Sequence, residues 1–305
     1  RDGLSGGMSR PTLQDRVEYA LARTLEGAIA KLPESVADRV GAAVGAAVRT
    51  PFGIRRGTVV ENLRRAFPDA DAEWIDATVR QTYRHLGREV VSMVRLSRLR
   101  PEEVVALTDV PSWDVFQEAL AEGKGVLLVT GHYGNWEVAA AAVAARGVPI
   151  SAIVKPQRNK LVDAMVQQAR ARLGIGTIPM KKAPRRVPRV LASGGVVGIV
   201  ADQDARWKGV WVPFFGIPAS TFRGPAQFAL RLDAAVLASI ARRLPDGRYR
   251  VEGTRIPVVR TGNVEEDERR LTAELAAHLE AEIRKDPGQY FWFHKRWKTL
   301  PPKEL

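Results

Sequence analysis

A short apolar run, Val126 to Thr130, is followed by a glycine-containing turn and an alanine-rich stretch, and this order constrains the fold more than any other feature. The run has the length and β-branched content of a buried parallel strand, and residues 139–145 have the composition of a helix. Gly131 and Gly134 permit a bend between the two, and Asn135 is suited to cap the helix. The segment therefore predicts a strand, a turn and a helix, the unit from which parallel sheets are built.

The turn carries His132, and a carboxylate, Glu137, follows five positions later. In open α/β sheets ligands bind beyond the carboxyl ends of the strands, where this histidine is predicted to lie. Residues five apart on an ideal helix point about 140° away from each other, so the two side chains meet only if His132 precedes the helix. We interpret His132 and Glu137 as an acid/base pair at a strand end.

The rest of the chain divides into a mainly helical part and a part in which predicted strands and helices alternate. Residues 12–98 are predicted to be mainly helical, and breaks at 32–33, 50–53 and 67–69 divide them into about four helices. From Gly123 onward, strand-like and helix-like segments alternate, which indicates a mostly parallel sheet. The predicted strands are 126–130, 150–154, 176–179, 196–200, 235–240 and 249–256, and the predicted helices are 139–145, 160–173, a segment around Val187, and 265–285.

The predicted fold class is therefore α/β, with a mostly parallel central sheet flanked by helices and a helical N-terminal layer. We expect one domain over residues 11–305, with the helical layer in 11–100 and the α/β core in 101–305. Residues 1–10 are rich in glycine and serine and are predicted to be a flexible end.

Composition limits the chemistry. The chain of 305 residues has no cysteine, which excludes disulfides and thiol catalysis, and its four histidines do not favour a zinc site, so we expect no metal. The net charge of +13 calls for an anionic partner, which could be nucleic acid, an acidic protein, a phosphorylated substrate or a membrane surface.

The N-terminal region is not predicted to cross a membrane. Charged residues interrupt the segment 17–48, so no window reaches the roughly 20 apolar residues that a spanning helix needs, and no signal peptide is recognised. Residues 17–29 have helical spacing with one apolar face. We interpret this face as packed on the core, and the alternative is a helix that lies on a membrane.

Further polar clusters follow other predicted strands. After 150–154 come Lys155, Arg158 and Asn159, whose cationic members could hold a phosphate or polarise a carbonyl, or could be a solvated loop. After 196–200 come Asp202 and Asp204. The former is better placed to orient a base or a sugar hydroxyl, while one of the two could serve a turn.

A third cluster combines aromatic and polar side chains. Phe214 and Phe215 could line an apolar channel, with Thr221 and Arg223 facing a polar head group, or the two phenylalanines could be ordinary core. All these residues are predicted to bind substrate. A basic run, 181–189, and an aromatic and basic segment, 290–298, suit a membrane interface or stacked bases.

Six motifs in a fixed order carry a resemblance to a known family. They are Asn62 to Pro68, Gly131 to Glu137, Ala201 to Asp204, Val212 to Gly216, Gly224 to Ala226, and Gln289 to Lys298. Together they resemble the late acyltransferases of lipid A biosynthesis, which belong with the lysophospholipid-type acyltransferases that carry an H-x4-D/E motif. The similarity runs from about residue 15 to residue 300.

The resemblance implies a glycerol-phosphate-acyltransferase-like fold and transfer of a fatty acyl chain to a hydroxyl of an acylated, phosphorylated glucosamine disaccharide. It implies acyl carrier protein or CoA as the acyl donor and no cofactor. The site would lie at the cytoplasmic face of the inner membrane, with peripheral attachment, because this chain has an amphipathic segment where such enzymes commonly have a hydrophobic anchor. By similarity, His132 is the general base, Glu137 its partner, Asp202 an acidic residue lining the site and Arg158 an arginine near the pocket.

The chemistry is consistent with that role. A sugar hydroxyl is too weakly acidic to attack a thioester unaided, so a neutral imidazole within about 3 Å must remove its proton. Glu137 would hold the tautomer and stabilise the imidazolium, as the third member of a serine triad does. Direct transfer needs no serine or cysteine nucleophile.

Three alternatives stay open. The acceptor could be a phosphatidylinositol mannoside or another lipid, acylated from acyl-CoA. Simple thioester hydrolysis would release free fatty acid without an acceptor. The charge would also suit a nucleic-acid-binding protein, although no recognisable binding module is present.

Overall fold

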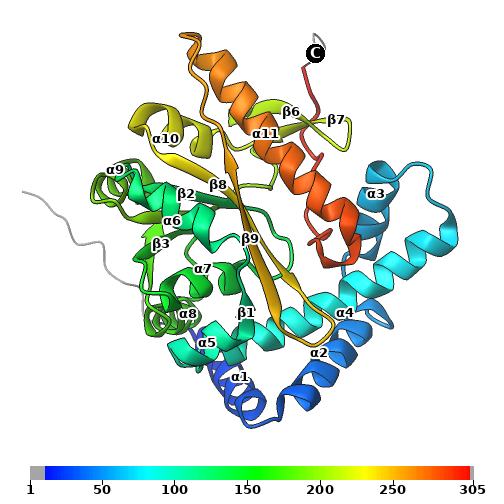
Figure 1. The fold of residues 1–305 in the computed structure, drawn as a ribbon. Coiled ribbons are helices and arrows are strands. Elements are labelled where there is room, and N and C mark those ends of the chain that lie inside the picture. Colours follow the sequence, from blue (N-terminus) through cyan, green and yellow to red (C-terminus); the bar gives the residue numbers. More distant parts are fainter. Residues whose placement is uncertain (1–10, 303–305) are drawn as a thin grey trace, which may run out of the picture.

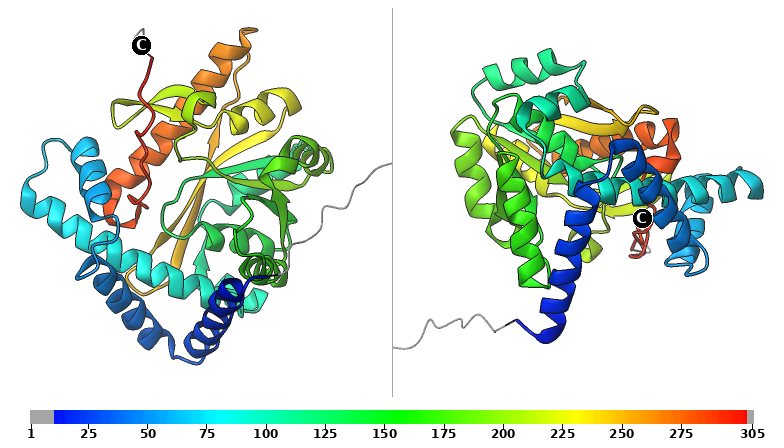
Figure 2. Two further views of the ribbon diagram at one scale, coloured as in Figure 1. Left: turned by 180° about the vertical axis from the view of Figure 1, so that it is seen from behind. Right: turned by 90° about the horizontal axis from the view of Figure 1, so that it is seen from below.

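The computed structural model describes residues 11–302, so the end predicted at 1–10 lies outside the described residues. A seven-stranded sheet forms the centre, helices cover both of its faces, and the N-terminal helices wrap around one end of the molecule (Figures 1 and 2). The α/β class, the largely parallel sheet and the helical N-terminal region are all as the sequence predicts.

Four helices form the N-terminal layer, as the three sequence breaks predict: α1 (Leu13–Ala30), α2 (Glu34–Arg49), α3 (Arg56–Ala66) and α4 (Ala72–Leu96). Capping residues determine where α1 and α4 begin. The side chains of Thr12 and Asp71 accept hydrogen bonds from backbone N–H groups in the first turns of these two helices. Helices α2 and α4 pack closely through glycines. A Cβ atom on Gly45 would lie 2.0 Å from the carbonyl oxygen of Tyr83, so no larger residue fits there.

The central sheet has the strand order β1-β9-β8-β2-β5-β3-β4, and its only antiparallel pair within the described residues is β8 with β9. Its strands are β1 (Thr108–Asp109), β2 (Val126–Thr130), β3 (Ile150–Val154), β4 (Ile175–Pro179), β5 (Val196–Val200), β8 (Ala235–Arg243) and β9 (Tyr249–Ile256). The central strand β2 pairs in parallel with both β5 and β8. The polar ends of β2 and β5 therefore lie side by side.

The remaining elements cover the sheet and close its edges. They are α5 (Pro101–Leu107), α6 (Trp113–Ala121), α7 (Trp136–Ala145), α8 (Lys160–Arg172), the short helix η1 (Met180–Lys182), α9 (Ala183–Ala192), η2 (Arg206–Lys208), the hairpin β6 (Val210–Phe214) and β7 (Ile217–Thr221), α10 (Gly224–Leu232), α11 (Val264–Lys285) and η3 (Pro287–Gln289). Neither the hairpin nor α10 was predicted as an element.

Strand β2 is buried on both faces, and its side chains divide between two cores. Val126 and Leu128 pack on the side of α6 and α7, whereas Leu127 and Val129 pack on the side of α9, α10 and α11. This alternation follows from the two-residue repeat of a strand. It explains why the sequence of β2 is continuously apolar, as buried parallel strands are.

The apolar face of α1 does not pack on the core, contrary to the interpretation that the sequence favours. Leu13, Val17, Leu21 and Leu25, spaced four residues apart, are 79%, 50%, 60% and 59% exposed. The helix contacts α4 and α8 through its other side, where Glu26 is buried against Arg23. The structure therefore leaves a stripe of large apolar side chains on the surface.

Candidate active site

The register of β2 and β5 brings His132 and Asp202 together. Thr130 pairs with Val200 at the ends of the two strands, and each of the two side chains comes two residues later. The Nδ1 atom of His132 lies 2.6 Å from Oδ1 of Asp202, and the backbone N–H of His132 donates to Oδ2 over 2.9 Å. Both carboxylate oxygens of Asp202 are thus bound by the same residue.

Burial and charge fix the protonation of this pair. Burial lowers the pKa of His132, but the charge and hydrogen bond of Asp202 outweigh it, so the net pKa lies above the ordinary value. Burial raises the pKa of Asp202, yet the charge of His132 and its two hydrogen bonds hold that pKa well below its ordinary range. Asp202 is therefore ionised, Nδ1 carries the proton of the neutral ring, and Nε2 keeps a free lone pair.

The loop that carries His132 is fixed by backbone contacts to the C-terminal segment and to β8. The carbonyl of His132 accepts from the N–H of Phe291, and the N–H of Gly134 donates to the carbonyl of Gln289. Gly134 has a φ of 56°, and a Cβ atom there would lie 1.9 Å from the carbonyl oxygen of Ala241. Asn135 caps α7 as predicted, because its side chain accepts from the N–H of Val138.

Glu137 does not contact His132 in the manner that the sequence suggests. It lies in the first turn of α7, and its carboxylate binds Arg170 of α8 in a bidentate pair of 3.0 and 2.5 Å. Both side chains are 17% exposed. The position that the sequence assigns to Glu137, next to Nδ1, is occupied by Asp202, because helix formation directs Glu137 toward α8.

The other side of the imidazole faces a glutamine and a second histidine. The Nε2 atom of Gln203 lies 3.4 Å from Nε2 of His132 and 2.8 Å from Nε2 of His294. The rings of Trp136 and His294 approach the His132 ring edge-on, with centroids 4.6 and 4.9 Å away. Burial, together with the charge of His132, lowers the pKa of His294 to about 4. The sequence assigned no individual role to Gln203, and it included His294 only as part of the aromatic and basic segment 290–298.

A cleft of about 350 Å³ opens from His132 along the sheet, between β2, β3 and β5 and the helices α7 and α8. Its apolar walls include Leu128, Ala139, Ala140, Ile150, Ala152 and Ile199. Arg170, Glu137 and Lys155 also line it, and Met180 and Phe222 line it while remaining 49% and 38% exposed. The cleft is thus apolar along its walls, with an imidazole and a guanidinium among its polar groups.

Three predicted binding residues lie elsewhere. Arg158 is exposed and does not line the cleft, and its charge acts on Asp15 and Glu18 of α1. Asn159 caps α8 and donates to Glu18 over 2.9 Å, so it joins α8 to α1. Asp204 accepts from the N–H of Arg206 and from the hydroxyl of Thr299, which is the turn role considered above.

The aromatic cluster is mostly core. Phe214 and Phe215, at the turn of the β6–β7 hairpin, are buried and pack with the aromatic residues of the C-terminal segment. Thr221 is buried and accepts from Arg296 over 2.5 Å. Arg223 pairs with Glu268 over 3.6 Å. Phe214 and Thr221 do border a small apolar cavity behind Asp202, but none of the four lines the cleft of His132.

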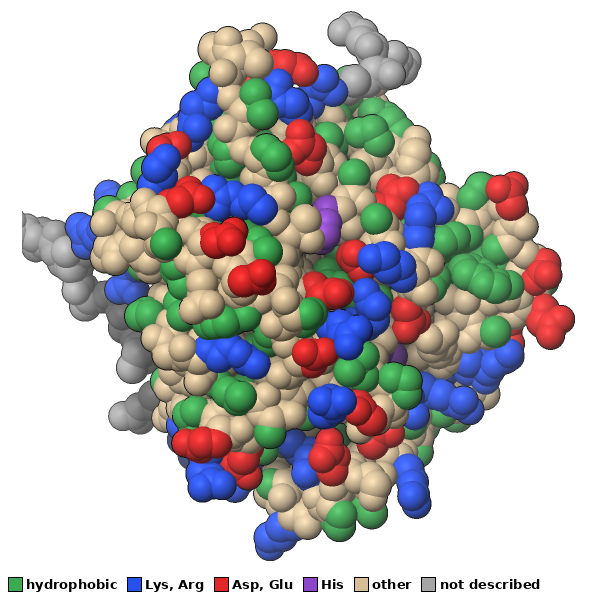
Figure 3. Space-filling view, viewed as in Figure 1, with side chains coloured by type: hydrophobic (Ala, Val, Ile, Leu, Met, Phe, Trp, Pro, Cys, Tyr) green, Lys and Arg blue, Asp and Glu red, His purple; other side chains and the backbone are tan. Residues whose placement is uncertain are grey.

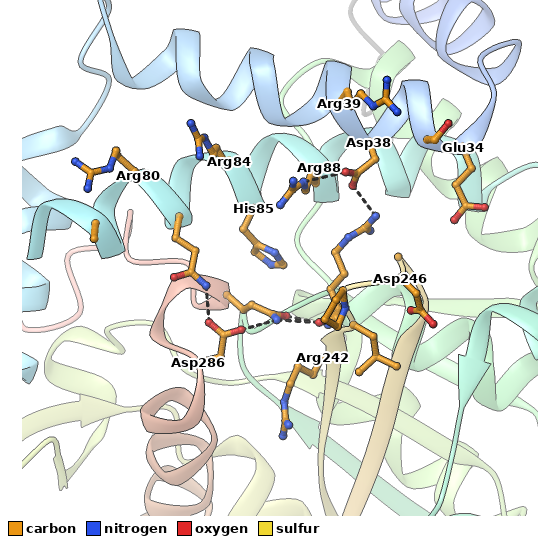
Figure 4. Close-up of a pocket in the computed structure, with 18 residues that line it drawn as sticks. Glu34, Asp38, Arg39, Arg80, Arg84, His85, Arg88, Arg242, Asp246 and Asp286 are labelled. Atoms are coloured by element: carbon orange, nitrogen blue, oxygen red, sulfur yellow. Dashed lines mark hydrogen bonds and ion pairs between the residues drawn. The ribbon is translucent and has the colours of Figure 1, made fainter. Parts of the chain in front are cut away.

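A larger cleft, of about 1140 Å³, lies between α2, α4 and the tip of the β8–β9 hairpin (Figure 4). Its arginines alternate with carboxylates, and Asp38 binds both Arg88 and Arg243. His85 points into it, and burial lowers the pKa of this histidine. This cleft does not include His132 among its lining residues, and the ion pairs of Asp38 with Arg88 and Arg243 join the helical layer to the sheet.

No group of three or more His, Cys, Asp or Glu side chains that could hold a metal ion occurs within residues 11–302. On the face shown in Figure 3, basic and acidic side chains are interspersed. That face has no continuous basic stripe of the kind that follows a nucleic-acid backbone. A base with an oriented tautomer in an apolar cleft suits proton removal from a substrate hydroxyl.

Comparison with known proteins agrees with this chemistry. Residues 17–299 match the family model described as bacterial lipid A biosynthesis acyltransferase. A lipid A biosynthesis palmitoleoyltransferase and a lauroyltransferase, both of Escherichia coli strain K12, are 27% and 26% identical, and each alignment covers 90% of this chain and 89% of the relative. A phosphatidylinositol mannoside acyltransferase of Mycolicibacterium smegmatis is 26% identical over 67% of this chain and 68% of its own. The chain is an acyltransferase and belongs to the bacterial lipid A biosynthesis acyltransferase family.

Proposed function

We propose that this enzyme transfers a fatty acyl chain from a thioester of acyl carrier protein or CoA to a hydroxyl of a membrane glycolipid, most simply a lipid A precursor. The observation that carries the proposal is the His132–Asp202 pair, whose unprotonated Nε2 atom faces an apolar cleft beyond the sheet. The relatives that align over nine tenths of the chain are named for lipid A biosynthesis, which favours that acceptor.

His132 acts as the general base. Its Nε2 atom accepts the proton of the acceptor hydroxyl while the oxygen attacks the thioester carbonyl carbon. Asp202 holds the productive tautomer and stabilises the imidazolium that forms, which is the role that the sequence assigned to Glu137. The acyl chain passes directly between the two substrates, without an acyl-enzyme.

Arg170 supplies the positive charge of the cleft. Its Nε and one terminal nitrogen bind Glu137, so the plane of the guanidinium is fixed. The other terminal nitrogen is left to bind an anionic or carbonyl oxygen of a substrate, and Lys155 lines the same cleft. This assignment replaces Arg158, and it gives Glu137 the task of orienting an arginine rather than a histidine.

The apolar part of the cleft accommodates the acyl chain. Small residues leave room between the sheet and the covering helices, namely Ala139, Ala140, Ala152 and Gly198. A volume of about 350 Å³ lies at the lower end of the range for ligand sites, roughly 300–1,000 Å³. An extended alkyl chain buried there would bring its carbonyl carbon next to His132.

Peripheral attachment to the cytoplasmic face of the inner membrane completes the proposal. No helix within residues 11–302 has the length and apolar character needed to span a bilayer. The exposed stripe of α1 and the 75% exposed Trp207, which lies between Arg206 and Lys208, have the composition of surfaces that bind the interface of anionic membranes.

A second acceptor is favoured by one observation. The phosphatidylinositol mannoside acyltransferase of Mycolicibacterium smegmatis aligns over two thirds of the chain at a similar identity. A mannoside hydroxyl would be the same kind of nucleophile next to His132, so the same site would bind the acceptor and the acyl donor of that reaction.

Mass spectrometry of the products tests the proposal. The purified enzyme is incubated with acyl thioesters of carrier protein or CoA and with either a lipid A precursor or a phosphatidylinositol mannoside. We expect an ester product that His132→Ala abolishes, whereas His278→Gln, a change outside the cleft, leaves it intact. Release of free fatty acid without any acceptor adduct would instead indicate a thioesterase.

A further inference from the structure

We propose that the side-chain amide of Gln203 donates the hydrogen bond that stabilises the oxyanion of the tetrahedral intermediate, and that His294 is the positioning residue that orients this amide. The inference rests on the proposed acyl transfer and deepens it. Gln203 follows Asp202 directly in the chain, and its Nε2 atom lies between the two histidine rings.

The hydrogen-bond pattern fixes which end of the amide faces the reaction centre. The Nδ1 atom of His132 donates to Asp202, so its Nε2 atom is an acceptor in the neutral ring. An amide oxygen would be repelled by that lone pair, whereas an N–H group donates to it. The 2.8 Å contact requires His294 to accept the second amide hydrogen at its own Nε2 atom. Both hydrogens of Gln203 are therefore directed at the two imidazoles.

Nε2 of His132 has one lone pair, so the acceptor hydroxyl that donates to it displaces one of these amide hydrogens. The acceptor oxygen forms a bond to the thioester carbon, its proton moves to Nε2 of His132, and the carbonyl π electrons move onto the carbonyl oxygen. The protonated ring no longer accepts a hydrogen bond at Nε2, so the amide N–H of Gln203 donates to the new oxyanion instead. Collapse of the intermediate breaks the C–S bond, and the thiolate sulfur takes the proton from His132.

The environment of His294 suits it to accept rather than donate. Its pKa of about 4 keeps the ring neutral at physiological pH, and the charge of Arg55 acts in the same direction as that of His132. Asn62 donates to the backbone carbonyls of Trp292 and His294 over 2.7 and 2.6 Å, which fixes the backbone that carries the ring. The acceptor for the Gln203 amide is thus held in place from the helical layer.

Steady-state kinetics with both substrates varied tests the role of Gln203. Gln203→Met keeps the length of the side chain but removes the donor, and we expect kcat to fall by about 10²–10³-fold, the effect of losing one oxyanion donor, with little change in either KM. Gln227→Met is the matched control, because Gln227 lies on α10 and binds Glu268 away from the cleft. We expect it to retain the wild-type kcat.

Paired substitutions test His294. His294→Gln retains an acceptor oxygen and is expected to keep most of the activity, whereas His294→Phe removes the acceptor and should lower kcat by a similar factor to Gln203→Met. Adding Gln203→Met to His294→Phe should then cause little further loss, because both changes remove the same oriented donor. Circular dichroism and thermal unfolding of each variant establish that the protein is folded.

The outcomes separate this inference from the proposed function. If the wild-type enzyme transfers no acyl group to any acceptor, the proposed function fails. If the wild-type enzyme is active and folded Gln203→Met retains kcat within about twofold, or loses only affinity for the acceptor, Gln203 is not the oxyanion donor and the inference alone is overturned. Equal loss in His294→Gln and His294→Phe would overturn the positioning role of His294.

Discussion

Asp202, and not the nearby Glu137, holds the Nδ1 atom of His132, at a distance of 2.6 Å and across 70 positions of sequence. The two residues meet because β2 and β5 are neighbours in the sheet and are in register, Thr130 with Val200. Glu137 is closer in sequence but belongs to α7 and binds Arg170. The proposed catalytic pair therefore depends on the order of the strands in the folded sheet.

This pair predicts the pH dependence of catalysis. The base must be neutral, and Asp202 raises the pKa of His132 above its ordinary value of 6.5. The rate constant kcat/KM should therefore rise with pH and level off above an apparent pKa that is higher than 6.5. Asp202→Asn should shift that apparent pKa downward and lower the plateau by about 10²–10⁴-fold, the contribution of a positioned base. A pH profile that Asp202→Asn leaves unchanged would contradict the assignment.

Glu137 and Arg170 should behave as an ion pair rather than as part of the base. Both are largely buried, so removing one partner leaves an uncompensated charge, and Glu137→Gln should lower the free energy of unfolding by about 2–3 kcal/mol. The double variant Glu137→Gln/Arg170→Met should recover part of that loss. Denaturant unfolding of the two single variants and the double variant measures the coupling.

The same variants distinguish the two carboxylates in the assay. Because Glu137 does not touch the imidazole, Glu137→Gln should leave the apparent pKa of kcat/KM unchanged even where it lowers the rate. A shift of that pKa equal to the one caused by Asp202→Asn would restore Glu137 as the partner of His132.

Much of the fold follows from local sequence signals. The strands 126–130, 150–154, 196–200 and 249–256 have the predicted bounds. The first three are short, mainly apolar runs, whereas the strand 249–256 is of mixed character and ends before Pro257. The four N-terminal helices are separated by the three predicted breaks. The hairpin of β6 and β7 was not predicted. Its two phenylalanines pack into the core, which was the alternative to a substrate-binding role.

The site was predictable only in part, because it combines segments that sequence spacing does not relate. The positions of His132 and Asp202 at strand ends could be inferred, but their contact depends on the order of β2 and β5. Arg170 lines the cleft from α8, and His294 contacts Gln203 from the C-terminal segment. The motif 289–298 was itself a signal for His294, since it is part of the family resemblance. Nothing in the sequence assigned a role to Gln203 beyond its place next to Asp202.

Asn62 should contribute strongly to stability. Its buried amide donates to the carbonyls of Trp292 and His294. Asn62→Ala would leave the buried carbonyl of Trp292 without this donor and would leave that of His294 with the N–H of Arg296. We expect a loss of about 2–3 kcal/mol in the free energy of unfolding, which chemical denaturation would measure. Asn263→Ala, which removes an exposed helix cap of α11, is the comparison, with an expected loss of about 1 kcal/mol. Equal losses would show that the hydrogen bonds from Asn62 to the C-terminal segment stabilise the protein no more than an exposed helix cap does.

His294 should make the protein sensitive to acid. Its pKa in the folded state is about 4, below the ordinary 6.5, so the unfolded chain binds the proton first as the pH falls. The contribution of this group is therefore complete above about pH 6.5 and is lost progressively between about 6.5 and 4. In His294→Gln the fall in melting temperature over that range should be smaller than in the wild type. If the melting temperatures of the wild type and of His294→Gln depended on pH in the same way, this assignment would be contradicted.

The exposed stripe of α1 should determine binding to anionic membranes. Burial of a leucine side chain is worth about 1.5–3 kcal/mol, so Leu21→Glu should weaken binding to vesicles of phosphatidylglycerol and phosphatidylethanolamine by about tenfold or more. Sedimentation with vesicles measures the bound fraction, and the activity toward a detergent-dispersed acceptor should be unchanged. Gln117→Glu introduces the same charge on the exposed face of α6 and is the matched control.

Salt separates the apolar contribution from the electrostatic one. Binding of the wild type should weaken as the ionic strength rises, because the net charge of +13 attracts the anionic surface through screened interactions. The ratio of Gln117→Glu to Leu21→Glu binding should change little, because the two variants have the same net charge and apolar burial depends weakly on moderate salt. If Leu21→Glu binds as tightly as the wild type while Trp207→Ser does not, the membrane contact is made around Trp207 and not by the stripe of α1.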